Sequence, residues 1–201
     1  ATRGGAPFGG WLPRAVVAAE DQRFFEHPGW DLAEMAAAWS SPAADDARRR
    51  GASTITQQLA RLLVTGHEPT VARKVRELLA AAELERTLGK ARILELYLAI
   101  APWGDGQCGA EAASLHLFGR PAARLDPVEA AWLASLLRNP DLLLDRARRG
   151  GAEPRLVAIV QAMRIQPVSA RPGLAETART YVPPPLGGGR RAEGGPPAPV
   201  P

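Results

Sequence analysis

The sequence predicts an all-α protein. Hydrophobic residues make up 46% of the 201 residues but aromatic residues only 5%, so the core must consist largely of Ala and Leu. Both types favour helix, and runs of β-branched residues, which would indicate strands, are few. A chain of this length is long enough for one domain with a sizeable core.

Three regions of the chain differ in composition. Residues 1–11 are Gly-rich and are expected to be irregular. Residues 167–201 carry runs of Pro and Gly that cannot build a core, so they are expected to form a disordered tail. The folded domain is therefore predicted over residues 12–166.

The first helix is expected over residues 13–26, because a proline suits a first helical turn and good helix formers follow it. On a helical wheel Glu20 falls between Val17 and Phe24, which places a carboxylate on an apolar stripe. Burial there would raise its pKa, which is the state that a general base needs near neutral pH. A stray glutamate on an apolar edge, followed by an ordinary turn at residues 27–29, fits the same pattern.

A second helical run is expected over residues 30–39, followed by a mobile, solvated loop. Residues 51–61 are typical of a loop that feeds a helix, with Ser53 or Thr54 as the cap. The hydroxyls and paired glutamines at this helix start offer donors to a sugar or a phosphate. An ordinary capped helix explains them equally well.

The longest helix is expected over residues 70–88. Apolar residues at i, i+3, i+4 and i+7 spacing form a stripe on it: Val71, Val75, Leu78, Leu79 and Ala82. Glu77 lies nearly opposite the stripe, with Arg73 one turn behind and Lys74 near it. These three are either an exposed ion-pair face or the charged wall of a cleft, and periodicity does not separate the two.

Later parts of the chain carry clear start and stop signals. Gly89 is expected to break the long helix, and the next helix, over residues 91–101, should turn four side chains inward: Ile93, Leu94, Tyr97 and Leu98. Further helices are predicted over 109–118 with Gly119 as its cap, from Asp126 to before Asn139, and over 153–164.

Charge and cysteine content narrow the choice of partners. The net charge of +4 suits a partner with phosphates or an anionic membrane surface. Nucleic acid is the generic alternative, but no helix-turn-helix, zinc or RNA-binding signature supports it. The single cysteine, Cys108, excludes an internal disulfide and a cysteine-based metal site. No stretch approaches the roughly 20 apolar residues of a membrane span, and no signal peptide is visible.

Taken in order, these stretches resemble the peptidoglycan glycosyltransferases, the transglycosylase domain of class A penicillin-binding proteins and of their monofunctional relatives. Four motifs carry the resemblance: EDQRFFEHPG (20–29), GASTITQQL (51–59), RKVRE (73–77) and RILELYL (92–98), the last running on through Gly104, Gly109, Phe118-Gly119 and Glu129-Ala130-Ala131. Together they cover about residues 12–163. Any one motif would be weak, whereas the ordered set is highly specific.

The resemblance implies a lysozyme-like helical lobe with a smaller, mobile jaw over about residues 30–66. Leu32, Met35 and Trp39 in the jaw would then face the bilayer. The implied reaction polymerises lipid II into β-1,4-linked glycan strands, with inversion at the donor's anomeric carbon and release of undecaprenyl pyrophosphate. The implied partners are lipid II, the growing strand, the membrane surface and cell-wall synthesis or division proteins, with no nucleic acid. The implied location is the outer, periplasmic face of the plasma (inner) membrane, with an anchor upstream of Ala1 or absent from this chain.

The resemblance also implies roles for individual residues. Glu20 matches the general base that deprotonates the acceptor's 4-hydroxyl, and Glu77 matches a second acid near the leaving pyrophosphate. Arg73 and Lys74 match the basic residues that bind the phosphates. The other matching cleft residues, several of which should be structural, are Asp21, Phe24, His27, Thr54, Gln57 and Gln58. No cofactor is required, and a Mg²⁺ or Mn²⁺ ion near the pyrophosphate is left open.

Some positions depart from the family pattern. Arg61 stands where the family usually has Lys. Arginine would bind a phosphate through a rigid fork of N–H donors, whereas lysine would bind it as a point charge. The other departures bear on acceptor binding and rate: Ala37, Pro42, Ala52, Ala99 and Cys108. Two rival interpretations remain, a lysozyme-like enzyme that cleaves peptidoglycan and a catalytically impaired relative that scaffolds the cell-wall machinery. The first would share the fold and the lone glutamate but would not need Arg73 and Lys74.

Overall fold

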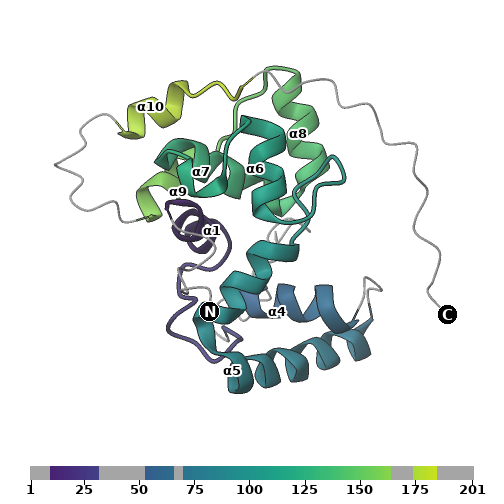
Figure 1. The fold of residues 1–201 in the computed structure, drawn as a ribbon. Coiled ribbons are helices and arrows are strands. Elements are labelled where there is room, and N and C mark those ends of the chain that lie inside the picture. Colours follow the sequence, from purple (N-terminus) through teal and green to yellow (C-terminus); the bar gives the residue numbers. More distant parts are fainter. Residues whose placement is uncertain (1–9, 32–52, 66–69, 164–173, 185–201) are drawn as a thin grey trace, which may run out of the picture.

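A computed structural model describes residues 10–31, 53–65, 70–163 and 174–184 (Figure 1). These residues form helices, turns and loops without a strand, which confirms the predicted all-α class. The α-helices are α1 (Leu12–Glu20), α4 (Ile55–Ala60), α5 (Val71–Ile100), α6 (Ala110–Phe118), α7 (Pro127–Ser135), α8 (Pro140–Arg148), α9 (Leu156–Ala162) and α10 (Leu174–Thr180). Shorter helical turns are η1 (Arg61–Thr65), η2 (Ala122–Arg124) and η3 (Leu136–Arg138).

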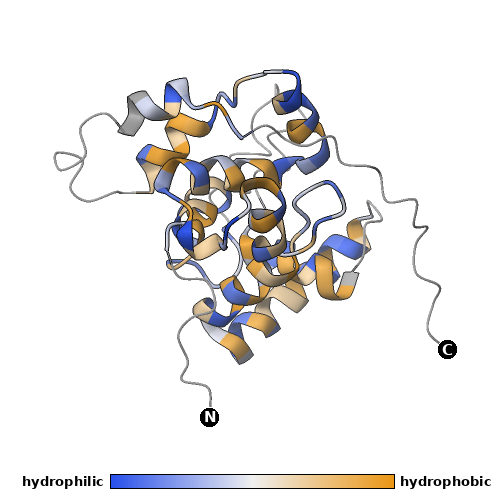
Figure 2. Ribbon diagram, turned by 45° about the horizontal axis from the view of Figure 1, so that its top comes forward, coloured by the Kyte–Doolittle hydropathy of each residue, from blue (hydrophilic) through white to orange (hydrophobic). Residues whose placement is uncertain are grey.

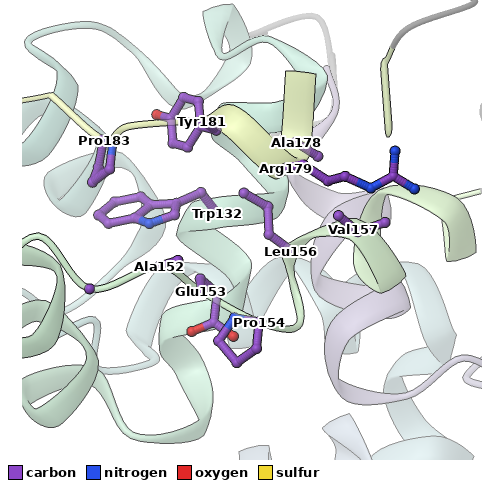
Figure 3. Close-up of a pocket in the computed structure, with 11 residues that line it drawn as sticks. Trp132, Ala152, Glu153, Pro154, Leu156, Val157, Ala178, Arg179, Tyr181 and Pro183 are labelled. Atoms are coloured by element: carbon purple, nitrogen blue, oxygen red, sulfur yellow. The ribbon is translucent and has the colours of Figure 1, made fainter. Parts of the chain in front are cut away.

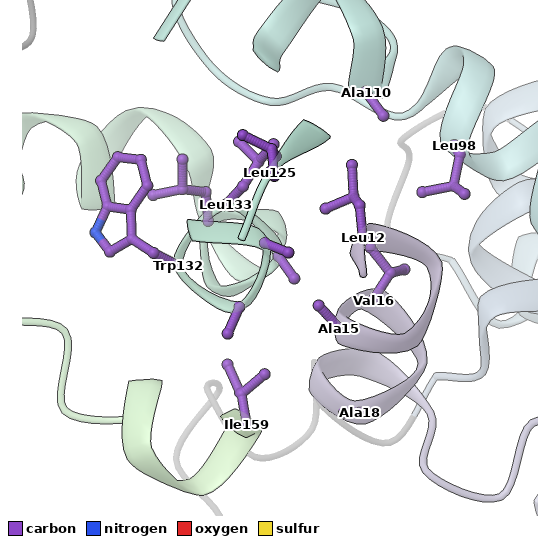
Figure 4. Close-up of a cluster of buried hydrophobic side chains, with 14 of the residues drawn as sticks. Leu12, Ala15, Val16, Ala18, Leu98, Ala110, Leu125, Trp132, Leu133 and Ile159 are labelled. Atoms are coloured by element: carbon purple, nitrogen blue, oxygen red, sulfur yellow. The ribbon is translucent and has the colours of Figure 1, made fainter. Parts of the chain in front are cut away.

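Helix α7 forms the centre of the core. Every residue of α7 is buried, and α1 and α9 pack against it (Figure 4). Alanines at three of its positions allow these helices to approach closely, while Leu12 and Val16 of α1 fill the space between them. The start of α7 is the predicted one, since Asp126 and Glu129 form a reciprocal capping box.

Helix α1 is shorter than predicted. It ends at Glu20 rather than near residue 26, because Asp21 leaves the helical region with φ −163° and ψ 77°. The Asp21 carboxylate accepts a hydrogen bond from the backbone N–H of Ile55 at 3.0 Å, which draws the chain away from the helix axis. Phe24 is therefore buried by the following turn and not by helical spacing.

The first half of α5 buries the face that carries Glu77 rather than the face that carries the apolar stripe. Three residues of the apolar stripe point outward, with Val71 83%, Val75 50% and Leu79 67% exposed, and its other two residues are half-buried. Glu77 is only 3% exposed. Helix α4 packs on the side of α5 that carries Glu77 and Ala81. Figure 2 shows hydrophobic residues along the ribbon of the long helix as well as along the helices of the lobe. Glu77 is therefore covered by α4, and the apolar stripe does not mark the side of α5 that another helix covers.

The second half of α5 agrees with the sequence. Gly89 interrupts the helix with φ 72° and ψ 162°, a conformation that favours glycine, and the chain then turns towards the lobe (Figure 1). The four side chains expected to point inward are all buried: Ile93, Leu94, Tyr97 and Leu98. No described helix is both long enough and apolar enough to cross a membrane.

The C-terminal region differs from the expected disordered tail over residues 174–184. Residues 174–180 form α10, which packs against α9 and α7 and buries Ala178. Tyr181 lies beside Trp132, with ring centroids 6.3 Å apart, at the edge of a pocket between α7, α9 and α10 (Figure 3). Ala178 and Tyr181 are the side chains through which this mostly polar segment packs on the lobe. The jaw residues Leu32, Met35 and Trp39, and the departures at 37, 42 and 52, lie outside the described residues.

Candidate active site

The start of α4 is fixed by Thr54. Its hydroxyl accepts a hydrogen bond from the Gln57 N–H at 3.1 Å and donates one to the Gly29 carbonyl at 2.6 Å. Thr54, not Ser53, is therefore the cap that the sequence left undecided. Because the same hydroxyl reaches the turn after α1, it sets the position of α4 relative to that turn.

Asp21 and His27 hold this turn together. Both oxygens of Asp21 lie near His27 Nε2, at 2.9 and 3.1 Å, and one of them also accepts from the Ile55 N–H. His27 Nδ1 accepts from the Gly29 N–H at 3.2 Å, so Nε2 carries the proton that is donated to Asp21. Both side chains are buried. Their contacts give these two predicted cleft residues a structural role.

Phe24 is buried beneath the same turn. Its ring packs edge-to-face on Phe25, with centroids 5.0 Å apart, and Lys90 Nζ lies 4.5 Å from its centre. Lys90 also pairs with Glu85 at 2.6 Å, and Glu85 accepts from the Thr56 hydroxyl at 2.5 Å. Phe24 therefore helps to join the turn to α4 and to the bend in α5.

Glu20 is the last residue of α1 and is partly buried. Gln58 Nε2 donates a hydrogen bond to its Oε2 at 3.0 Å. Burial raises the pKa of Glu20, and the Gln58 hydrogen bond and the positive charges of Arg155 and Arg138 oppose this rise. The carboxyl group thus has the raised proton affinity expected of a general base near neutral pH.

Three residues near Glu20 were not predicted to belong to the site. Tyr97 donates its hydroxyl hydrogen to Gln58 Oε1 at 2.7 Å. Arg155 Nη2 donates to the carbonyl of Ala19 at 2.7 Å, across 136 positions of sequence, and Arg138 adds a second positive charge. The hydroxyl of a tyrosine on the inward-facing side of a helix needs a hydrogen-bond partner. This need was the sequence feature that could have indicated Tyr97 as part of the site. No local pattern indicates either arginine.

Glu77 lies in a buried ion cluster on the α4 side of α5. Arg73 Nη1 contacts one of its oxygens at 2.5 Å, and Lys74 Nζ contacts the other. Lys74 also reaches Ser53 Oγ and Gln57 Oε1, both at 3.3 Å, so all three of its donors have acceptors. Glu77 is 3% exposed and Arg73 15%, which excludes the exposed ion-pair face for this pair, whereas Lys74 is 34% exposed at the edge of the cluster.

Several buried donors nearby have no acceptor among the described residues. They are Gln57 Nε2, Arg61 Nε and Arg73 Nε. An unsatisfied buried donor is costly unless a ligand supplies the acceptor, so these atoms are suited to an oxygen-rich molecule. Arg61 lies on η1, where α4 passes into a wider π-helical turn.

The cluster does not fit a metal held by the protein. Within the described ranges, no three His, Cys, Asp or Glu side chains come together as a cation site. Both oxygens of Glu77 already face Arg73 and Lys74. A Mg²⁺ or Mn²⁺ ion would find no free carboxylate here.

The sequence model of the transglycosylase family matches residues 8–164. The chain belongs to this family. A biosynthetic peptidoglycan transglycosylase of Nitrosomonas eutropha is 47% identical over 129 residues, which are 64% of this chain and 53% of the relative. Relatives of the same name from Bordetella pertussis and Citrobacter koseri are each 42% identical, over 158 and 154 residues, and the alignments cover 77% of this chain and 65% and 64% of the relatives. The chain thus spans about half to two thirds of the length of these relatives.

The structural role of Asp21 can be tested with Asp21→Asn. An amide offers one acceptor and turns an N–H₂ group towards the donors of His27 or Ile55, so we expect the free energy of unfolding to fall by about 1–3 kcal/mol. Urea denaturation measures this change. The matched control is Asp145→Asn, because that carboxylate is 59% exposed and makes only a long contact of 3.4 Å with Arg148 among the described residues. The control should lose less than about 0.5 kcal/mol, and equal losses would contradict the assignment.

Proposed function

We propose that this protein polymerises lipid II into β-1,4-linked glycan strands and releases undecaprenyl pyrophosphate. Its membership of the transglycosylase family supports the reaction class. The observation that carries the proposal is the contrast between two acids on either side of α4. Glu20 meets a neutral amide and has a raised pKa, whereas Glu77 is held between two cations.

In the proposed step, Glu20 takes the proton from the acceptor's 4-hydroxyl. The acceptor oxygen forms a bond to the donor's anomeric carbon from the face opposite the pyrophosphate, which gives inversion. The bond from that carbon to the pyrophosphate oxygen breaks, and its electron pair leaves with the pyrophosphate. A carboxylate with raised proton affinity lowers the barrier because proton transfer accompanies bond formation.

The departing pyrophosphate needs positive charge more than it needs a proton. Arg73 supplies this best, since its Nε has no acceptor among the described residues, while Lys74 has used all its donors. Glu77 keeps the two cations in place at the start of α5. Arg61 adds a further buried donor that phosphate oxygens can satisfy.

We also propose that the protein works at the outer face of the plasma membrane. The polyprenyl chain of lipid II confines the substrate to the bilayer, so the site must reach its surface. Helix α5 exposes three apolar residues, Val71, Val75 and Leu79, and the positively charged Arg76 is exposed beside them. An apolar surface with a positive charge next to it is suited to an anionic bilayer.

The central test is the Glu20→Gln variant. This change keeps the side-chain volume and the hydrogen-bonding partner Gln58 but removes the ability to take a proton. Polymerisation, measured as glycan product length and amount on a gel after incubation with lipid II, should fall about 10²–10⁴-fold. Circular dichroism should show an unchanged fold. Near-normal polymerisation by the folded variant would end the assignment, and cleavage of preformed peptidoglycan by the wild type would favour the hydrolase.

Glu77→Gln tests the second acid. The amide cannot hold two cations as the carboxylate does, so we expect turnover to fall at least about tenfold while binding of the lipid substrate is largely kept. Steady-state polymerisation rates and a separate binding measurement distinguish the two effects. A variant with wild-type turnover would show that Glu77 only stabilises the fold.

The membrane proposal can be tested by making α5 more polar. The double variant Val75→Ser, Leu79→Ser removes exposed apolar surface, so co-sedimentation with vesicles containing anionic lipid should weaken about tenfold or more. The control is Ala72→Ser, Ala91→Ser, which makes two other exposed positions of α5 more polar. If both variants bind vesicles like the wild type, this face does not contact the bilayer.

A further inference from the structure

We propose that Tyr97 is a positioning residue that orients Gln58 and thereby keeps Glu20 ionised and ready to accept a proton. The proposal rests on the polymerase function proposed above. It concerns a buried hydroxyl on the second half of α5, which reaches the general base only through another side chain.

The geometry forms a continuous chain of donors and acceptors. The Tyr97 hydroxyl donates to Gln58 Oε1 at 2.7 Å, and Gln58 Nε2 donates to Glu20 Oε2 at 3.0 Å. Gln58 Nε2 also lies 3.4 Å from the Ser53 carbonyl, so both of its hydrogens face acceptors. The three linked side chains come from α5, α4 and α1.

An amide side chain can present either end to a carboxylate. With Nε2 towards Glu20 it stabilises the negative charge, and with Oε1 towards Glu20 it repels that charge and favours the protonated acid. In the first orientation the Tyr97 hydroxyl donates its hydrogen to Oε1. In the second it could only accept from Nε2, and its hydrogen would lose this acceptor, so Tyr97 favours the first orientation. Burial and the negative charge of Glu20 raise the pKa of Tyr97 well above its ordinary value, so Tyr97 keeps its proton throughout the working pH range.

Other charged groups also act on Glu20. Asp21 follows it in sequence and raises its pKa, while Arg155 at the start of α9 and Arg138 on η3 lower it. The positive charge of Arg61 on η1 lowers the pKa of Tyr97. None of these groups makes a hydrogen bond that depends on the Tyr97 hydroxyl. Loss of the hydroxyl alone should therefore raise the pKa of Glu20 further, by weakening one of the interactions that lower it.

The experiment is Tyr97→Phe, with turnover on saturating lipid II measured across pH. A higher pKa of Glu20 means that less of it is ionised at a given pH, so the acidic limb of the profile should move up by about half to one pH unit. The deficit should reach about three- to tenfold on that limb and shrink towards alkaline pH. A uniform loss at every pH would show a merely structural role.

Two further variants sharpen the test. Gln58→Leu should move the limb at least as far, and the double variant Tyr97→Phe, Gln58→Leu should move it no further, because Tyr97 acts through Gln58. Additive displacements would overturn the proposal. Tyr181→Phe is the matched control, since it removes the chain's other tyrosine hydroxyl, which has no partner among the described residues and lies between α7 and α10. Its profile should match the wild type.

A second readout does not depend on polymerisation. Carbon-13 NMR of labelled glutamate carboxyls gives the titration midpoint of Glu20, identified by its absence in Glu20→Gln. The midpoint should rise in Tyr97→Phe and stay constant in Tyr181→Phe. An unchanged midpoint overturns the proposal even if the protein polymerises lipid II. A raised midpoint in a protein without polymerase activity would instead leave the Tyr97 role standing and remove the proposed function.

Discussion

Two adjacent glutamines on α4 connect the two charged parts of the site. Gln57 accepts from Lys74 in the α5 cluster, and Gln58 donates to Glu20 at the end of α1. Consecutive residues on a helix point about 100° apart, so one helix can serve both neighbours at once. The arrangement depends on the rotation of α4 about its axis, which Thr54 and Asp21 fix through its first backbone N–H groups.

The environments of the two acids differ because different groups stabilise the negative charge of each carboxylate. Glu20 faces an amide, with the nearest arginine contact made to the backbone of Ala19, so burial dominates and its pKa is raised. Glu77 is buried more deeply yet meets two cations directly. Unequal environments of this kind suit chemically identical side chains to different tasks. Under the proposed function, Glu20 accepts a proton and Glu77 holds the two cations in place.

Local signals in the sequence predicted much of the fold. The cap at Asp126, the break at Gly89 and the stop at Gly119 each depend on a residue and its immediate neighbours, and all three are found in the structure. The burial of α5 was not predictable, because periodicity defines a stripe but not which side another helix covers. Glu77 can be buried because Arg73 and Lys74 satisfy it, and their spacing showed that the three can pair but not that α4 covers them. No local pattern could indicate that Arg155 lies near the site, because its hydrogen-bond partner Ala19 is 136 positions away in the sequence.

The buried cations also bear on the choice between a polymerase and a hydrolase. A glycosidase expels a sugar alkoxide, which is a poor leaving group and needs a carboxylic acid beside it to donate a proton. A pyrophosphate leaves as an anion, and positively charged donors stabilise it as its charge develops. The first reaction gives Arg73 and Lys74 no direct task, whereas the second needs positive charge held in a fixed place. Under the proposed function, the Nε of Arg73 is available to the leaving group, whereas Lys74, whose donors all have acceptors, holds the cluster together.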